Sequence, residues 1–217
     1  MKCTTLDSLP TSRYLRRFLD LRSAGDILNA AAPINRADKE ITEAWAAIRH
    51  LRPYFLDAPM ERLLIDLCAG NALTSIIAAH ILPVKSAFAI DKTPRRRPGH
   101  TAVQRWAYDQ GNIFSVGWNP EIELMRDAAV CAVHACGQLA IRVIELYQQW
   151  PWAKRLVLLP CCRGNMKGHR VPAAFASRVS KYEAWAWWLS ELANGELHID
   201  ENVLSPCNGV IVAEKGR

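Results

Sequence analysis

Hydrophobic positions along the chain fall into short runs that are separated by longer segments of helical periodicity. Apolar runs with the length of buried strands occur at residues 63–65, 87–90, 128–133 and 156–159. A further strand is predicted at residues 106–108, and helices are predicted at residues 73–82, 138–149 and 177–193. Strands that alternate with helices in this way indicate a mostly parallel sheet with right-handed crossovers.

Two flanking regions depart from this alternation. Residues 11–57 show helical stripes without strands, and the second helix there is predicted to end before Pro53. Near the other end of the chain, residues 203–204 and 210–213 are predicted to pair as an antiparallel hairpin. We therefore predict an α/β fold, with an N-terminal helical segment at residues 1–57 and a sheet-containing domain at residues 58–217.

Small and polar residues gather directly after the predicted strands. These clusters lie at residues 66–71, 91, 109–112, 134–137 and 160–164. The carboxyl ends of parallel strands meet at one edge of a sheet, and ligands of such sheets bind beyond that edge. The sequence therefore predicts a ligand site that is built from these clusters.

The turn after the first of these strands has the features of a site for a nucleotide-like ligand. Ala69 and Gly70 are small enough for a ligand to approach the backbone closely. Asp91 follows about 20 residues later, where a carboxylate can accept hydrogen bonds from ribose hydroxyls. The single glycine does not match a dinucleotide fingerprint, which favours an adenosyl ligand without a pyrophosphate.

This turn also resembles a motif of a known family. Residues 66–72, with the sequence DLCAGNA, are similar to the first motif of S-adenosylmethionine-dependent methyltransferases, although Ala72 stands at its final glycine. Asp91 matches the ribose-binding acid of that family. Residues 109–112 resemble its third-strand motif, in which Asn112, or else Asp109, would contact the adenine amine. The resemblance implies a Rossmann-like methyltransferase fold with S-adenosyl-L-methionine as cofactor. It implies these cofactor-binding residues: Asp66, Cys68, Ala69, Gly70, Asn71, Asp91, Lys92, Asn112 and His134.

Two further segments resemble a group within that family. The group carries a His-x-Cys-Gly segment after strand four and a Cys-Cys segment after strand five, and residues 134–137 and 160–162 are similar to them. The end of the chain, at residues 204–213, looks like the last hairpin of that group. The group includes a tRNA 2′-O-methyltransferase, which has further histidines where Arg163 and Gly164 stand here. The resemblance thus implies a methyltransferase enzyme that acts on RNA, either tRNA-like or another nucleic acid.

The residues after strands four and five offer several chemistries. Methyl transfer is an in-line displacement, and His134 is the candidate base for an oxygen or nitrogen acceptor, unless it only orients its turn. Cys136 and Cys161 are candidate catalytic thiols, because methylation at C5 of a pyrimidine requires a thiolate to attack C6. Alternatively, the cysteines are packed side chains, or they bind zinc together with His134, Cys162 and Cys207. The sequence has no Cys-x-x-Cys pair, and adjacent cysteines rarely bind one ion, so we expect no metal.

Composition adds a preference for an anionic partner. The 217-residue chain has a formal net charge of +6 and a pI of about 9.0, which is compatible with binding RNA or DNA. Basic residues flank the predicted ligand edge at Lys92, Arg95, Arg96, Arg97, Arg163, Lys167, His169 and Arg170. Their side chains either follow the phosphates of a polynucleotide or lie on solvated loops. The late helix is predicted to place its aromatic side chains in the core rather than against bases: Tyr182, Trp185, Trp187 and Trp188.

Cysteine usage and targeting signals bear on the setting of the protein. The seven cysteines are odd in number and lie largely in apolar segments, so we expect reduced thiols. The first ten residues lack the apolar core of a secretion signal, and no stretch has the length of a membrane span. We therefore expect a cytoplasmic protein without membrane contact, and its oligomeric state is left open. The alternative function is a catalytically inactive methyltransferase-fold protein that binds nucleic acid or protein.

Overall fold

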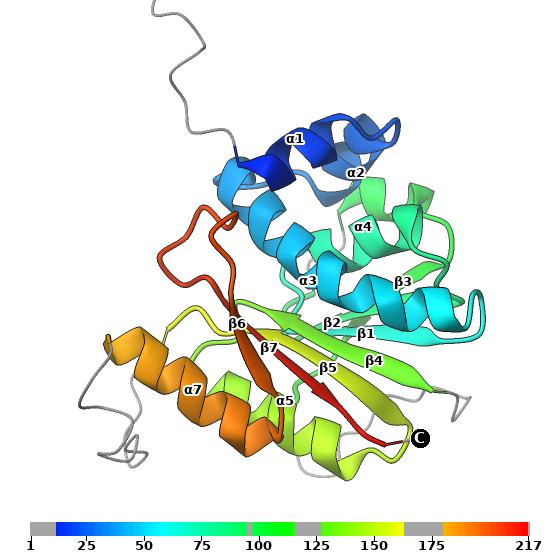
Figure 1. Ribbon diagram of the computed structural model, residues 1–217. Helices are drawn as coiled ribbons and strands as arrows, with labels where there is room; N and C mark the ends of the chain where they lie inside the picture. Colours follow the sequence, from blue (N-terminus) through cyan, green and yellow to red (C-terminus); the bar gives the residue numbers. More distant parts are fainter. Residues whose placement is uncertain (1–11, 95–96, 116–126, 163–179, 217) are drawn as a thin grey trace, which may run out of the picture.

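A seven-stranded sheet forms the centre of the protein (Figure 1). The structure is a computed structural model, and it describes residues 12–94, 97–115, 127–162 and 180–216. The strands are β1 (Leu63–Leu67), β2 (Ser86–Asp91), β3 (Trp106–Gln110), β4 (Ala128–Val133), β5 (Ala153–Leu159), β6 (Glu196–Ile199) and β7 (Gly209–Glu214). They lie in the order β3-β2-β1-β4-β5-β7-β6, with β1 to β5 parallel and β7 antiparallel to both of its neighbours. The predicted mostly parallel sheet with a C-terminal antiparallel hairpin is confirmed.

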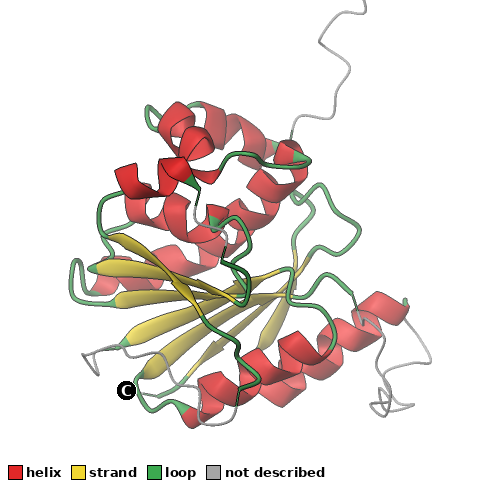
Figure 2. Cartoon of the chain, turned by 180° about the vertical axis from the view of Figure 1, so that it is seen from behind, coloured by secondary structure: helices red, strands yellow, loops and turns green. Residues whose placement is uncertain are grey.

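Helices cover both faces of the sheet (Figure 2). One face carries α1 (Arg13–Leu19), α2 (Ala24–Ala31), α3 (Ala37–Asp57) and α4 (Leu73–Ile81), and the short 3-10 helix η2 (Pro98–Ala102) packs beside α2. The other face carries α5 (Gln138–Gln149) and α7 (Lys181–Ala193). Because two helical layers enclose the sheet, the apolar core is divided into two clusters, one on each side.

The central strands are buried on both faces, which explains why their sequences are almost continuously apolar. All five residues of β1 are buried, as are five of the six residues of β4. A strand that is covered on both sides has no polar face to alternate with its apolar one. The same burial leaves the strand ends as the places where polar residues can gather.

The N-terminal helices differ from the prediction in two respects. Helix α3 does not end before Pro53 but continues to Asp57, because the last turn buries Tyr54 and Phe55 against the core. This packing outweighs the one backbone hydrogen bond that a proline cannot donate. Helix α2 was not expected as a separate element. The division of the chain at residue 57 stays a prediction, and α3 packs directly against β4 and β5.

The C-terminal hairpin also differs in detail. Its first strand is β6 at Glu196–Ile199, whereas residues 203–204 lie in the connection between β6 and β7. Strand β6 is short and no residue in it is fully buried, so its sequence lacks the apolar run of a central strand. In α7, Trp185 is fully buried, as predicted, whereas Trp187 is 53% exposed and the core prediction is wrong for it. Among the described residues, no helix is long and apolar enough to cross a membrane.

Candidate active site

The turn after β1 is organised around a buried carboxylate. Asp66 is only 2% exposed, and its Oδ2 accepts a hydrogen bond from the backbone N–H of Ser75 in the first turn of α4. Burial raises the pKa of Asp66 to about 7, with a smaller contribution from the nearby Asp91 carboxylate, while the Ser75 hydrogen bonds oppose the shift. Gly70 adopts a φ of +55°, which favours glycine, and Ala72 adopts a similar φ of +62°. The strand thus ends in a sharp turn directly above Asp66.

Asp91 ties the end of β2 to this turn. One carboxylate oxygen accepts a hydrogen bond from the N–H of Gly70 at 3.1 Å, and the other accepts one from the N–H of Thr93 at 2.9 Å. Each oxygen keeps a further lone pair that can accept a hydrogen bond. The carboxylate is therefore held in a fixed orientation while it remains able to bind a hydroxyl.

A pocket of about 260 Å³ opens beside Asp91. Its lining brings together four residues that were predicted for the cofactor, Cys68, Asp91, Lys92 and Asn112. It also contains Gly111, from the predicted cluster at residues 109–112, and three residues that the sequence did not indicate, namely Ile113, Phe114 and Leu139. The missed residues are mostly apolar, and the signal that could have found them is an aromatic residue two positions after Asn112. The pocket offers a carboxylate on one side and apolar surface on the other.

Two side chains in this pocket have specific roles. The Oδ1 of Asn112 accepts a hydrogen bond from the N–H of Phe114, so it also stabilises the turn that carries Phe114. Burial first, and then the carboxylates of Asp91 and Asp66, raise the pKa of Cys68 to about 12, although Lys92 opposes the shift. Cys68 is therefore a protonated thiol at neutral pH and packs as a neutral side chain.

A second, much smaller cavity of about 40 Å³ lies between the turn and β4. It is lined by four predicted residues, Asp66, Ala69, Asn71 and His134, together with Glu40, Ala44, Leu73, Thr74 and Val133. The amide of Asn71 donates a hydrogen bond to the carboxylate of Glu40, and its oxygen accepts one from the N–H of Leu73. The structure therefore distributes eight of the nine predicted cofactor residues between two hollows, and Gly70 lines neither of them.

His134 lies within ion-pair distance of a carboxylate that the sequence did not reveal. It follows β4 with a φ of +66°, and its Nε2 lies 2.7 Å from Oε2 of Glu43. Glu43 belongs to α3 and is 2% exposed, and its other oxygen lies 3.2 Å from Nζ of Lys39. The sequence feature that could have revealed this contact is a charged residue on the apolar face of α3, close to Ile41 and Ala44. A buried carboxylate beside an imidazole is an arrangement that can orient a base and stabilise its protonated form.

The family of the chain follows from its similarity to known proteins. Residues 36–169 match the family model described as a methyltransferase domain, and this match covers more than half of the chain. The chain belongs to this methyltransferase family. Its cofactor is S-adenosylmethionine, and the fold places the predicted donor residues at the ligand-binding edge of the sheet. None of the curated proteins matches the chain.

Solved structures with the same fold are distant in sequence. An uncharacterized protein from Listeria monocytogenes serotype 4b is 13% identical with a TM-score of 0.50, and the match covers 80% of this chain and 67% of that one. The tRNA m1A22 methyltransferase TrmK of B. subtilis is 14% identical with a TM-score of 0.47, with coverages of 80% and 65%. A putative tRNA (m1A22) methyltransferase of Streptococcus pneumoniae, in complex with S-adenosyl-L-methionine, is 14% identical with a TM-score of 0.45, with coverages of 71% and 66%. The chain spans about two thirds of the length of these proteins.

The cysteines of the methyltransferase differ from the predicted reduced thiols. Cys136, after β4, and Cys161, after β5, form a disulfide, whereas Cys68, Cys131, Cys162 and Cys207 are free. A disulfide sulfur is not a thiolate, so neither Cys136 nor Cys161 can attack a pyrimidine while the bond is intact. The spacing of the cysteines could not reveal this pair, because connectivity does not follow from sequence.

The structure describes only two of the basic residues that were predicted near the site, Lys92 and Arg97. Lys92 is exposed at the rim of the 260 Å³ pocket. Arg97 has a structural role, because its guanidinium donates hydrogen bonds to the carbonyl oxygens of Ala31 and Pro33. The remaining predicted basic residues, Arg95, Arg96, Arg163, Lys167, His169 and Arg170, lie outside the described residues.

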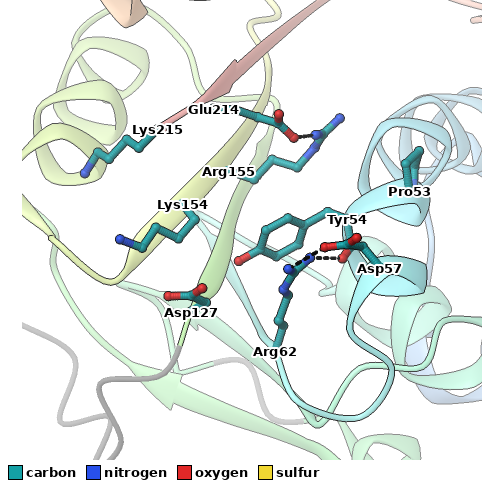
Figure 3. A pocket seen from close by; sticks show the side chains of 9 residues that line it. All are labelled: Pro53, Tyr54, Asp57, Arg62, Asp127, Lys154, Arg155, Glu214 and Lys215. Atoms are coloured by element: carbon teal, nitrogen blue, oxygen red, sulfur yellow. Dashed lines mark hydrogen bonds and ion pairs between the residues drawn. The ribbon is translucent and has the colours of Figure 1, made fainter. Parts of the chain in front are cut away.

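A larger cleft of about 650 Å³ lies at the opposite edge of the methyltransferase sheet (Figure 3). It is lined by Pro53, Tyr54, Asp57, Arg62, Asp127, Lys154, Arg155, Glu214 and Lys215. These residues lie near the amino ends of the parallel strands, and none of them was predicted for the site. Parallel sheets bind their ligands at the carboxyl edge, so the two smaller hollows are the candidate active site.

Proposed function

We propose that this methyltransferase transfers the methyl group of S-adenosylmethionine to RNA, with His134 as the base. The observation that carries the proposal is that the fixed Asp91 carboxylate, its pocket and the His134–Glu43 pair share one edge of the sheet. The first two suit a methyl donor, and the pair suits proton removal from an acceptor.

The residues of the larger hollow fit an adenosyl group. The free lone pairs of Asp91 suit ribose hydroxyls, and Phe114 and Leu139 offer apolar surface for an adenine ring, with Asn112 beside them. A Cβ added to Gly70 would meet no atom within 4 Å, so the backbone there borders open space. When bound, the cofactor supplies an electrophilic methyl group carried on a sulfonium.

The smaller hollow suits the amino-acid end of the donor. Asp66, Ala69 and Asn71 line it, and we assign them to this part of the cofactor. Because burial raises the pKa of Asp66 to about 7, a cationic group nearby would favour its ionised form. The hollow also includes His134, which places the base beside the donor residues.

His134 is oriented for proton transfer. Its Nε2 lies beside Glu43, its Nδ1 makes no hydrogen bond or ion pair with the described residues, and the side chain is 37% exposed. We assign Nδ1 to the removal of a proton from an acceptor hydroxyl or amine. The Glu43 carboxylate stabilises the imidazolium that results and keeps the ring in one orientation. The disulfide between Cys136 and Cys161 speaks against the covalent pyrimidine route.

Charge supports a polyanionic acceptor. The net charge of +6 and the exposed Lys92 beside the pocket both favour attraction of phosphates. Residues 134–137 and 160–162 resemble a group that includes a tRNA methyltransferase. RNA is therefore the acceptor class we propose, ahead of DNA, protein and small molecules.

The proposal is tested first by calorimetry with S-adenosylmethionine, comparing the natural protein with Asp91→Ala and Glu61→Ala. Loss of charge-assisted hydrogen bonds predicts that Asp91→Ala weakens binding by about tenfold or more. Glu61 is exposed just before β1, at the opposite edge, and its variant should bind the donor normally. Equal affinities of all three proteins would contradict the donor site.

Methyl transfer is then measured with a labelled methyl donor and pools of RNA, DNA and protein. Label that enters RNA, and that is lost with His134→Ala, supports the proposed reaction. Donor binding without transfer to any pool would instead favour the inactive methyltransferase-fold binding protein.

A further inference from the structure

Four cysteines converge at the carboxyl edge of the sheet, next to the candidate base. Cys136 follows β4, Cys161 and Cys162 follow β5, and Cys207 lies in the connection that leads into β7. The sulfur atoms of the first three all lie within 4.8 Å of one another. These three sulfurs therefore bring the ends of β4 and β5 together, and Cys207 lies before the neighbouring strand β7.

The backbone holds these elements in register. The N–H of Gly137 donates to the carbonyl oxygen of Cys162 at 3.0 Å, which ties the turn after β4 to the end of β5. The sulfurs of Cys136 and Cys161 both lie near the carbonyl oxygen of His134, at 3.3 and 3.6 Å. The cysteines are thus positioned by the strand ends and not by a free loop alone.

Cys207 is drawn into the same cluster. Strands β5 and β7 are antiparallel, and their register pairs Leu158 with Ile211. Cys162 lies four residues after Leu158, and Cys207 lies four residues before Ile211. Cys207 and Cys162 therefore lie at the same edge of the sheet, on neighbouring strand ends.

The side chains of adjacent cysteines usually point to different sides of a chain. For this reason, Cys161 and Cys162 were not expected to bind the same ion. Here the chain bends after β5, and the sulfurs of Cys161 and Cys162 are 3.8 Å apart. A tetrahedral zinc ion with Zn–S distances of about 2.3 Å requires sulfurs separated by about 3.8 Å. The geometry of this pair removes the objection.

We propose that Cys136, Cys161, Cys162 and Cys207, in their reduced form, bind a zinc ion as a closed four-thiolate site. Cys162 is exposed and offers a path for the metal, while Cys136 and Cys161 are partly buried. The ion crosslinks the loops after β4 and β5 to the loop before β7, and so fixes the backbone that carries His134. The disulfide between Cys136 and Cys161 is the oxidised, metal-free form of this site.

The interconversion is chemically balanced. A phosphine reductant attacks the disulfide, takes one oxygen atom from water to become a phosphine oxide, and leaves two thiols. Zinc(II) then displaces one proton from each of the four thiols, forming four Zn–S bonds without any change in oxidation state. Binding therefore releases up to four protons per ion.

The test titrates cobalt(II) and then zinc(II) into the full chain, reduced with a phosphine under anaerobic conditions. One equivalent of cobalt should bind and give a thiolate-to-metal charge-transfer band, which zinc should abolish by replacement. The oxidised protein should bind neither ion at this site. A folded, reduced protein without the band would overturn the proposal.

Single substitutions assign the ligands. Cys162→Ser and Cys207→Ser remove thiols that take no part in the disulfide, so each should weaken metal binding by at least about tenfold. Cys68→Ser is the matched control, because Cys68 is a free thiol outside the cluster, and it should bind cobalt normally. Unchanged affinity in Cys162→Ser or Cys207→Ser, with the fold verified by circular dichroism, would contradict the site. This readout does not use the methyl donor, so its failure is distinct from a failure of the proposed function.

Discussion

The two edges of the sheet differ in how completely their charges are paired. At the amino edge, Arg62 pairs with Asp57 and Arg155 pairs with Glu214 (Figure 3). Lys215 donates to carbonyl oxygens at the end of α5. At the carboxyl edge, the contacts of the Asp66 carboxylate within the described part of the chain are with Ser75. The charges of the 650 Å³ cleft are therefore mostly neutralised, whereas the two hollows at the carboxyl edge hold groups that a ligand can complete.

The volume of a cavity is therefore a poor guide to the position of the functional site. A cleft between paired side chains offers a ligand little that the protein does not already provide. A buried carboxylate with a raised pKa marks a place where burial costs stability, and such groups concentrate at functional sites. Substitutions at each edge of the sheet test this difference.

The largest effect is expected at His134. His134→Ala should reduce methyl transfer by about 10²- to 10⁴-fold, because a general base contributes about that much. Donor affinity should fall far less, since Asp91 and its pocket remain. Measuring kcat for methyl transfer, and donor affinity by calorimetry, separates the two effects.

Glu43→Gln sharpens this result at the partner of His134. The amide keeps the size of the side chain but loses the charge that stabilises the imidazolium, so transfer should fall by about tenfold or more. The pH profile of methyl transfer should differ between Glu43→Gln and the natural protein. A purely structural role of Glu43 would leave the profile unchanged. Full activity with an unchanged pH profile would remove Glu43 from the mechanism.

The next effect concerns stability and pH at Asp66. The folded-state pKa is raised to about 7, above an unfolded value of about 3.9. Between these values the folded protein binds more protons than the unfolded chain, so Asp66 makes the free energy of unfolding fall as pH rises, by at most about 1.4 kcal/mol per pH unit. Asp66→Asn should remove this dependence, as urea unfolding across the window will measure.

Glu61→Gln provides the control for that experiment. Glu61 is exposed at the amino edge, and its substitution should leave the pH dependence of unfolding as it is in the natural protein. If Asp66→Asn and the natural protein lose stability in parallel from about pH 4 to pH 7, the carboxylate is not the cause. The buried charge would then no longer distinguish the two edges.

The fold, and the position of the predicted donor residues at one edge of the sheet, were accessible from the sequence because each depends on local pattern. The doubly buried strands β1 and β4 read as apolar runs, and parallel topology alone brings Asp66 and Asp91 to one edge. Strand β6 was missed because it is short and only partly buried. Helix α3 was ended too early because the packing of its last turn is a tertiary effect.

The partners of the site residues were not accessible, since they come from distant positions. Glu40 and Glu43 reach Asn71 and His134 from α3, which lies outside the alternating pattern of strands and helices. The disulfide joins residues 25 positions apart, and nothing in that spacing selects one pair among seven cysteines. The edge of the sheet that carries the site could be predicted from the sequence, whereas the contacts between side chains at that edge are seen only in the structure.

The smallest effects are expected at the amino edge. Asp57→Asn and Glu214→Gln each break one ion pair whose acid is partly exposed, so each should change the free energy of unfolding by less than about 1 kcal/mol. Neither should alter donor affinity or methyl transfer, because the cleft lies at the opposite edge of the sheet from Asp91. Thermal unfolding and calorimetry check both statements. A loss of donor binding in either variant comparable to that of Asp91→Ala would mean that the two edges act together, and that the larger cleft belongs to the functional site after all.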